Sequence, residues 1–363
     1  MGFNCGIVGL PNVGKSTIFN ALTQSAAAES ANYPFCTIDP NTGMVAVPDE
    51  RLWVLKDIVK TGTVIPTRIE LVDIAGLVKG ASQGAGKGNA FVSSVREVDA
   101  ILHVVRCFED DDIIHVDGSI DPVRDIEVID LELGLKDEET VQRRLETVRK
   151  KQADKQLQET LPTLELVAAT LAEARPVRSL QLSREQEEHI RDLQLITAKP
   201  MLFVCNVDED AIAAGGNDHS TAVAAHAEAT GAASLLICGK IEEELSQLGP
   251  EERELFMQDY GMTESGLSSL IKAGYRLLGL ATYFTAGEKE VRAWQIEQGM
   301  KAPQAAGVIH TDFEKGFIRA EVASYADFVQ HHGEKGCREV GRLRAEGKDY
   351  IVQDGDVMHF LFA

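Results

Sequence analysis

Residues 9–16 read Gly-Leu-Pro-Asn-Val-Gly-Lys-Ser and hold the chemistry around which the chain is organised. This G-x-x-x-x-G-K-S string lies between an apolar run at 3–8, which predicts a strand, and an amphipathic stretch at 17–22, which predicts a helix. In that setting the glycines let the backbone curl so that successive N–H groups face phosphate oxygens. Lys15 then reaches the β- and γ-phosphates, and the Ser16 hydroxyl binds Mg²⁺. We therefore predict a phosphate-binding loop, followed by a helix whose positive end adds to the cradle.

Two downstream segments carry groups that would complete a metal and γ-phosphate site. Residues 69–74 predict a buried strand ending in Asp73-Ile-Ala-Gly76, so Asp73 is expected to hold Mg²⁺ and Gly76 offers an N–H to the γ-phosphate. The glycine-rich stretch that follows is typical of a segment ordered by that phosphate. Thr37, between two prolines, is the candidate second hydroxyl ligand, and the alternative is a loop threonine without a metal role.

The string Asn-Val-Asp-Glu at 206–209 follows an apolar strand and is expected to lie at the base. Guanine-specific P-loop enzymes have Asn-Lys-x-Asp here. Val207 lacks the stacking stem of lysine, and Glu209 extends the carboxylate by one methylene, which should crowd guanine. Backbone N–H groups near Gly239 would still suit guanine O6 and would face the amine of adenine. Because the main discriminator has changed, we expect ATP to bind, with GTP as the weaker ligand.

The residue that orients the attacking water is not the usual one. Switching GTPases place Gln directly after D-x-x-G, but Leu77 occupies that position and cannot hydrogen-bond. His115, at the end of the acidic segment 108–115, is our candidate for this role. The alternative is a surface loop histidine.

The elements that must position these groups predict an α/β fold. Apolar strands at 69–74, 100–106, 200–205 and 234–237 alternate with helices, which indicates a parallel sheet with its site at the strand ends. From 125 to 197 the pattern becomes a leucine stripe of coiled-coil type, which predicts an antiparallel pair of long helices inserted into that domain. One stretch of this arm is basic and forms a candidate RNA contact or, equally, the solvated face of a coiled coil: Arg143, Arg144, Arg149, Lys150, Lys151 and Lys155.

The segment from 280 onward consists of short strands and turns, and predicts a half-barrel, β-grasp-like domain with one main helix.

The composition of the chain limits its possible partners and location. The net charge of −21 should repel free nucleic acid over most of the surface. Six scattered cysteines without a C-x-x-C pair favour reduced thiols in the cytoplasm, and no apolar run approaches the length of a membrane span.

Taken together, these motifs resemble the YchF-type ATPases, a branch of the Obg-related P-loop NTPases. The resemblance rests on GLPNVGKST at 9–17, NYPFCTIDPNTG at 32–43, DIAGLVKGAS at 73–82, GNAFVS at 88–93, FEDDDIIHVDG at 108–118 and NVDED at 206–210. It implies a P-loop domain at 1–124 and 198–279, an inserted helical coiled-coil arm at 125–197, and a TGS domain at 280–363. Cys238 and Gly239 depart from the Ser-Ala that usually precedes the lysine at this position.

The resemblance also implies an activity, partners and residue roles. The activity would be slow, Mg²⁺-dependent hydrolysis of ATP in preference to GTP, with K⁺ as an additional candidate ion held by Asn12. The partner would be the ribosome, with the large subunit as the expected site and RNA held in a cleft between arm and TGS domain. The residues carried over are Asn12, Val13, Gly14, Lys15, Ser16 and Thr17 at the phosphates, Ser16 and Thr37 at Mg²⁺, and Asn206, Val207 and Glu209 at the base. Two alternatives stay open, namely an ordinary GTPase and a nucleotide-gated regulatory protein with negligible turnover.

Overall fold

The computed structural model describes residues 3–30, 41–74, 87–110, 112, 113, 115, 118–151 and 153–363. They belong to two compact units, one comprising Met1–Val45 and Glu70–Leu270 and the other Ala46–Ile69 and Ile271–Ala363. Within the described part of the chain, none of the helices combines the length and apolar character that a bilayer span needs.

A six-stranded sheet with the order β2-β4-β1-β5-β6-β7 forms the centre of the first unit. Its strands are β1 (Asn4–Val8), β2 (Thr42–Ala46), β4 (Arg68–Asp73), β5 (Ala100–Arg106), β6 (Met201–Asn206) and β7 (Ala233–Ile237). From β4 through β7 each neighbouring pair is parallel, so the predicted parallel sheet is confirmed. Both β5 and β6 are buried along their whole length, because their apolar residues are covered on both faces.

The helices of the first unit connect these strands. Outside the arm they are α1 (Lys15–Ser30), α3 (Lys87–Glu97), α8 (Glu209–Ala214), α9 (Asp218–Ala229), α10 (Gly239–Gln247), α11 (Pro250–Asp259) and α12 (Gly266–Leu277), the last of which continues into the second unit. The sequence predicted that the first helix ends at Leu22, with a polar stretch beyond it. In the structure α1 continues to Ser30 through an alanine-rich stretch, and alanine has the highest helix propensity of all residues.

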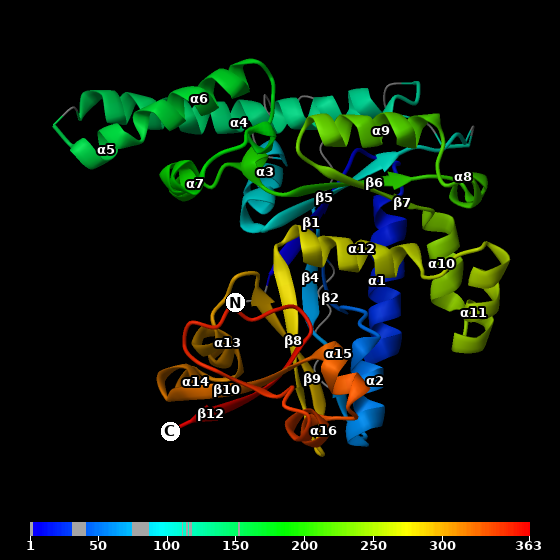
Figure 1. Cartoon of the computed structure of the whole chain (residues 1–363). Helices are drawn as coiled ribbons and strands as arrows, with labels where there is room; N and C mark the ends of the chain where they lie inside the picture. The colour runs from blue at the N-terminus through cyan, green and yellow to red at the C-terminus, as the bar shows by residue number, and fades with distance from the viewer. Residues whose placement is uncertain are drawn as a thin grey trace. The chain divides into compact units, whose positions relative to one another are not determined.

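The arm begins with the 29-residue helix α4 (Pro122–Lys150), and α5 (Lys155–Glu159) and α6 (Leu161–Ala172) return beside it (Figure 1). The arm ends with α7 (Arg184–Ile190) and three short 3₁₀ turns, η1 (Val177–Ser179), η2 (Arg191–Leu193) and η3 (Ile196–Ala198). The predicted leucine stripe is confirmed, since Leu164 and Leu171 pack against Val141 and Leu145 of α4 in one core. The prediction of a second long helix was wrong: α5 ends at Glu159 and α6 begins at Leu161, with Pro162 in its first turn, where proline is favoured.

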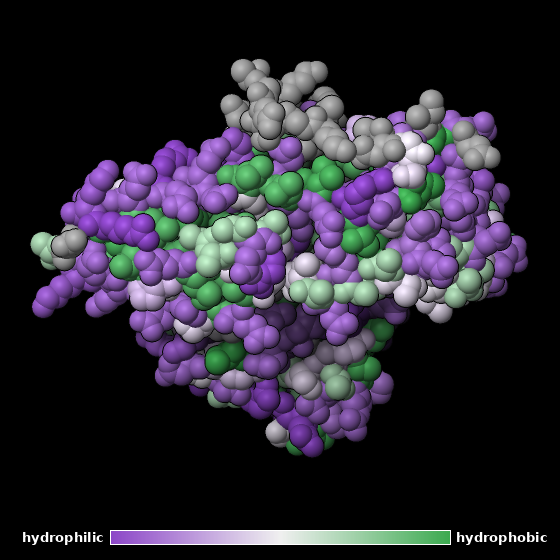
Figure 2. Space-filling view, turned by 90° about the horizontal axis from the view of Figure 1, so that it is seen from above, coloured by the Kyte–Doolittle hydropathy of each residue, from purple (hydrophilic) through white to green (hydrophobic). Residues whose placement is uncertain are grey.

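Figure 2 looks down on the face of the molecule that carries the arm, where hydrophilic residues crowd the tip and apolar strips run between them along its length. Leu131 and Leu135 of α4 and Leu166 of α6 are among the exposed apolar side chains of this unit. At the root of the arm, the Asp137 carboxylate accepts hydrogen bonds from the backbone N–H groups of Ile196 at 3.0 Å and Thr197 at 2.7 Å. These bonds tie α4 to the segment that leads into β6.

The second unit contains a mixed six-stranded sheet with the order β11-β10-β12-β8-β9-β3. Its strands are β3 (Val64–Ile65), β8 (Leu280–Ala286), β9 (Val291–Glu297), β10 (Phe317–Ser324), β11 (Arg344–Glu346) and β12 (Asp356–Phe362), and its helices are α2 (Arg51–Val59), α13 (Ala302–Ile309), α14 (Thr311–Lys315), α15 (Tyr325–Gln330) and α16 (Glu334–Glu339). The antiparallel β8–β9 pair, with β12 parallel to β8, agrees with the predicted β-grasp-like sheet. Several short helices replace the one main helix that was expected.

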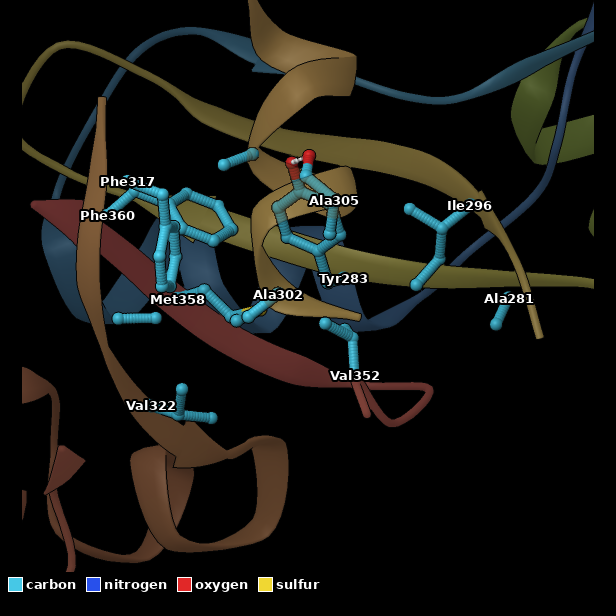
Figure 3. Packing of buried hydrophobic residues seen from close by; sticks show 12 residues of the cluster. Ala281, Tyr283, Ile296, Ala302, Ala305, Phe317, Val322, Val352, Met358 and Phe360 are labelled. Carbon is cyan, nitrogen blue, oxygen red and sulfur yellow. Dashed lines mark hydrogen bonds between the residues drawn. The ribbon is translucent and has the colours of Figure 1, made fainter. Parts of the chain in front are cut away.

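Tyr283 lies at the centre of the core on one side of this sheet, with Phe317, Phe360 and Met358 around it and α13 beyond (Figure 3). Its hydroxyl donates to the Ala305 carbonyl at 2.9 Å, which satisfies the one polar atom of a fully buried ring.

Residues 46–69 belong to this second unit, although the sequence placed them in the nucleotide-binding domain. The reason is long-range packing. Leu52 and Leu55 of α2 enter a second core with Phe284, and β3 pairs in parallel with β9 through Val64 and Val291. No local pattern in the sequence predicts either contact.

Candidate functional site

The loop between β1 and α1 has the backbone conformation that the P-loop motif predicts. Asn12 and Gly14 both have positive φ, 62° and 90°, so the chain curls tightly before α1 begins at Lys15. A side chain at position 14 would place its Cβ 2.1 Å from Asn206 Nδ2, so only glycine fits there. The Ile18 N–H donates to the Gly14 carbonyl at 3.0 Å, which starts the helix immediately after the loop.

Asn206 joins this loop to a second one on the far side of β6. Its Nδ2 donates to the Val13 carbonyl at 2.9 Å, and its Oδ1 accepts from the Gly239 N–H at 2.9 Å. The side chain is 5% exposed, so both bonds are shielded from water. Three strand ends, those of β1, β6 and β7, are therefore fixed to one another by a single amide.

Lys15 and Asp73 face each other at the phosphate end of the loop. The Lys15 ammonium donates to Asp73 Oδ1, and Asp73 stands at the end of β4, paired in register with Ile7 of β1. The Asp73 carboxylate and the Ser16 hydroxyl, one residue after Lys15, are hard oxygen donors of the kind that Mg²⁺ binds together with phosphate and water. Thr37 and Gly76, predicted to complete this set, lie outside the described residues, as does Leu77.

On the base side the predicted residues are present but already engaged with protein groups. Val207 is buried, and Glu209 is the first residue of α8, directly after the helix cap Asp208. The Glu209 carboxylate lies 2.5 Å from the Lys240 ammonium, and this hydrogen bond lowers the pKa of Glu209. The Gly239 N–H, expected to face the base, instead donates to Asn206. One donor that guanine O6 would need is therefore occupied.

A cavity of about 770 Å³ lies between these loops. Its lining includes these residues, which the sequence singled out: Asn12, Gly14, Lys15, Ser16, Thr17, Asn206, Val207 and Glu209. Val13 does not line it, because its side chain is buried beneath the loop near Gly9. The sequence analysis did not predict that Lys240 and Phe108 line this cavity. Phe108 could have been identified as an aromatic residue at the start of an acidic segment.

His115 does not lie on the surface, which corrects one of the two readings of this residue. The side chain is buried, and its Nε2 lies 2.7 Å from Oδ2 of Asp125, near the start of α4. The other carboxylate oxygen of Asp125 accepts from Arg124 at 3.0 Å. His115 is absent from the lining of the cavity, so a direct part in hydrolysis requires this segment to rearrange.

Two family models match the chain. Residues 4–132 match one described as a 50S ribosome-binding GTPase. Residues 280–363 match YchF-GTPase_C, described as a protein of unknown function (DUF933).

Full-length relatives are also similar. The Ribosome-binding ATPase YchF of Bacillus subtilis is 53% identical over 100% of both chains, and that of Escherichia coli O157:H7 is 54% identical over 100% of this chain and 99% of its own. The solved structure of the Schizosaccharomyces pombe YchF GTPase matches with a TM-score of 0.90 at 42% identity, covering 99% of this chain and 98% of the other.

Proposed function

Since this chain belongs to the YchF family, we propose that it binds ATP in the cavity between β1, β6 and β7, hydrolyses it slowly with Mg²⁺, and associates with ribosomes. The observation that carries the proposal is that Lys15 and the Asn206 junction line one cavity, with the Lys15 ammonium also bonded to Asp73. The curled loop supplies N–H groups to the phosphates, and the Lys15 ammonium neutralises their charge. Ser16 and Asp73 would hold Mg²⁺, which supplies charge neutralisation at the β- and γ-phosphates when bound.

Multiple-turnover phosphate release from ATP and from GTP tests the activity. We expect ATP to be the better substrate, and Lys15→Ala to lose most triphosphate binding because a charged hydrogen-bond donor is removed. Repeating the assay with K⁺ in place of Na⁺ tests the proposed ion at Asn12. The absence of turnover with and without ribosomes would leave only the nucleotide-gated regulatory protein, and tighter GDP than ADP binding would favour the GTPase.

For base selection, the engaged groups favour adenine. Guanine recognition needs a carboxylate free to accept from N1–H and the 2-amino group and a donor for O6. Glu209 is paired with Lys240, and the Gly239 N–H is bonded to Asn206. Calorimetric titration of ADP and GDP measures this preference directly.

For the hydrolytic water, we propose His115, held by Asp125. A carboxylate that accepts from one imidazole nitrogen fixes the tautomer and the ring orientation, as in other catalytic pairs. His115→Ala should lower kcat with little effect on ADP binding. Wild-type turnover in that variant would remove the role.

For the ribosome, we propose that RNA of the large subunit meets the arm, and a ribosomal partner implies a cytoplasmic location. Of the six basic residues in the stretch 143–155, Arg144, Arg149 and Lys150 are paired with acidic neighbours. Arg143, Lys151 and Lys155 form no ion pair with the described residues, so their charges would face phosphate. Replacing these three by Gln should weaken ribosome co-sedimentation. The slope of log K against log salt concentration should become shallower by the amount expected for the loss of about three phosphate contacts. An unchanged salt dependence would point to the TGS domain or to a protein contact instead.

A further inference from the structure

The arginine at the end of β5 takes no part in the phosphate and base contacts described above. Arg106 is 1% exposed, which is unusual for a cation at the edge of a nucleotide cavity. Among the described residues it forms no ion pair with a carboxylate. It donates to three backbone carbonyls instead.

All three guanidinium nitrogens donate to backbone carbonyls of one short loop. Nε donates to the Phe108 carbonyl at 3.2 Å, Nη2 to Asp110 at 3.1 Å and Nη1 to Ile113 at 2.8 Å. The Phe108 ring covers the same guanidinium, with its centroid 4.7 Å from Cζ. A planar fork of fixed N–H directions can serve three carbonyls at once, and a lysine ammonium cannot reproduce that arrangement.

The loop held in this way forms one wall of the nucleotide cavity. Phe108, Glu109, Asp110 and Ile113 all line it. The loop is also tied to the base side, because the Cys107 N–H donates to the Asn206 carbonyl at 2.8 Å. His115 follows two residues after Ile113, whose carbonyl the arginine fork holds.

The acidic character of this wall makes the cation necessary. Glu109 and Asp110 are exposed and border a cavity that takes a polyphosphate, so their carboxylates repel the ligand. A buried positive charge directly beneath the loop offsets part of that repulsion and fixes the backbone from which both carboxylates extend.

We propose that Arg106 is a positioning residue for nucleotide binding and hydrolysis: it clamps Phe108, Asp110 and Ile113 as a wall of the cavity and thereby places His115. The inference deepens the proposed function and rests on it for the hydrolytic part only.

The test compares Arg106→Lys, which keeps the charge without the fork, with Arg106→Met, which removes both. The dissociation constant for ADP and the kcat and KM for ATP are measured on the full chain. We expect Arg106→Lys to weaken ADP binding about fivefold and to lower kcat about tenfold, with Arg106→Met worse in both. Wild-type values in a folded Arg106→Lys protein would overturn the proposal.

Arg178→Lys is the matched control. Arg178 is a buried arginine of the same unit, with a side chain 3% exposed and paired with Asp130 at 2.6 Å, and it lies outside the nucleotide cavity. We expect it to lower the melting temperature without changing ADP affinity or kcat. If it changes both as strongly as Arg106→Lys, general loosening of the unit explains the result and the proposal fails.

Two further measurements remove the remaining ambiguity. If neither Arg106 variant folds, Phe108→Leu tests the clamp instead, because it removes the ring over the guanidinium from a half-buried position. An ADP affinity equal to that of the wild type would then refute the clamp. In a His115→Ala background, Arg106→Lys should lower kcat no further, and a full additional loss would refute the link to His115. If the wild-type protein hydrolyses nothing, the proposed function fails, while ADP affinity still judges Arg106.

Discussion

Replacing Asn206 by alanine removes the two hydrogen bonds that hold three strand ends together beside the nucleotide cavity. The Val13 carbonyl and the Gly239 N–H would both lose their partner. A buried polar group left without a partner costs about 1–3 kcal/mol. Taking the lower end of this range for each of the two groups gives about 2 kcal/mol.

This free energy should be observed mainly as lost nucleotide affinity, since the phosphate loop must be re-ordered each time a ligand binds. About 2 kcal/mol corresponds to roughly a 30-fold weaker dissociation constant. Calorimetric titration of ADP measures it, with Ser183→Ala as the control. That substitution removes the N-cap of α7 in the arm and lowers the free energy of unfolding by about 1 kcal/mol, but it changes no residue of the cavity. If Asn206→Ala binds ADP as tightly as wild type, the junction does not organise the site.

Three other substitutions test separate parts of the structure. Burial raises the pKa of Glu242, so its contribution to stability is present below the unfolded pKa of about 4.3 and is lost as pH rises through the higher folded pKa. Melting curves should show that the melting temperature of Glu242→Gln rises relative to wild type as pH increases above that value, whereas that of the exposed Glu244→Gln should not. A difference in melting temperature between Glu242→Gln and wild type that does not change with pH would contradict this. Leu164→Ala should destabilise the arm by about 2–5 kcal/mol in denaturant unfolding and leave ADP affinity intact, and a parallel loss of affinity would show that arm and cavity are coupled. Lys240→Ala should change the ADP-to-GDP affinity ratio less than about threefold because the pair is largely exposed, and a larger shift would assign selectivity to the ion pair.

Local patterns in the sequence predicted the elements whose burial is complete. The strands β5 and β6 were expected within a residue of their observed ends, because an uninterrupted apolar run has one stable environment, the interior of a parallel sheet. The phosphate loop was predicted from the spacing of its glycines. Gly14 has a left-handed φ of 90°, and a Cβ at Gly9 would lie 2.7 Å from the Val104 carbonyl oxygen.

What the sequence could not predict depends on contacts between distant residues. The partner of His115 is Asp125, and a histidine in an acidic segment looks solvent-facing until α4 is placed over it. Likewise, β3 joins a sheet whose other strands all come after residue 279. Periodicity describes which face of an element is buried, but not which element covers it.

We expect base selectivity in this cavity to depend more on the occupied Gly239 amide than on the ion pair between Glu209 and Lys240. The Lys240 side chain is 69% exposed and that of Glu209 is 32% exposed, so solvent screens their attraction and a ligand can displace the lysine at little cost. The Gly239 N–H is different, because its bond to Asn206 is buried and also holds the phosphate loop. Guanine O6 therefore lacks one hydrogen bond, a loss of about 0.5–1.5 kcal/mol, or roughly a two- to twelvefold preference for adenine. A preference far above that range would require a further direct contact to the adenine amine.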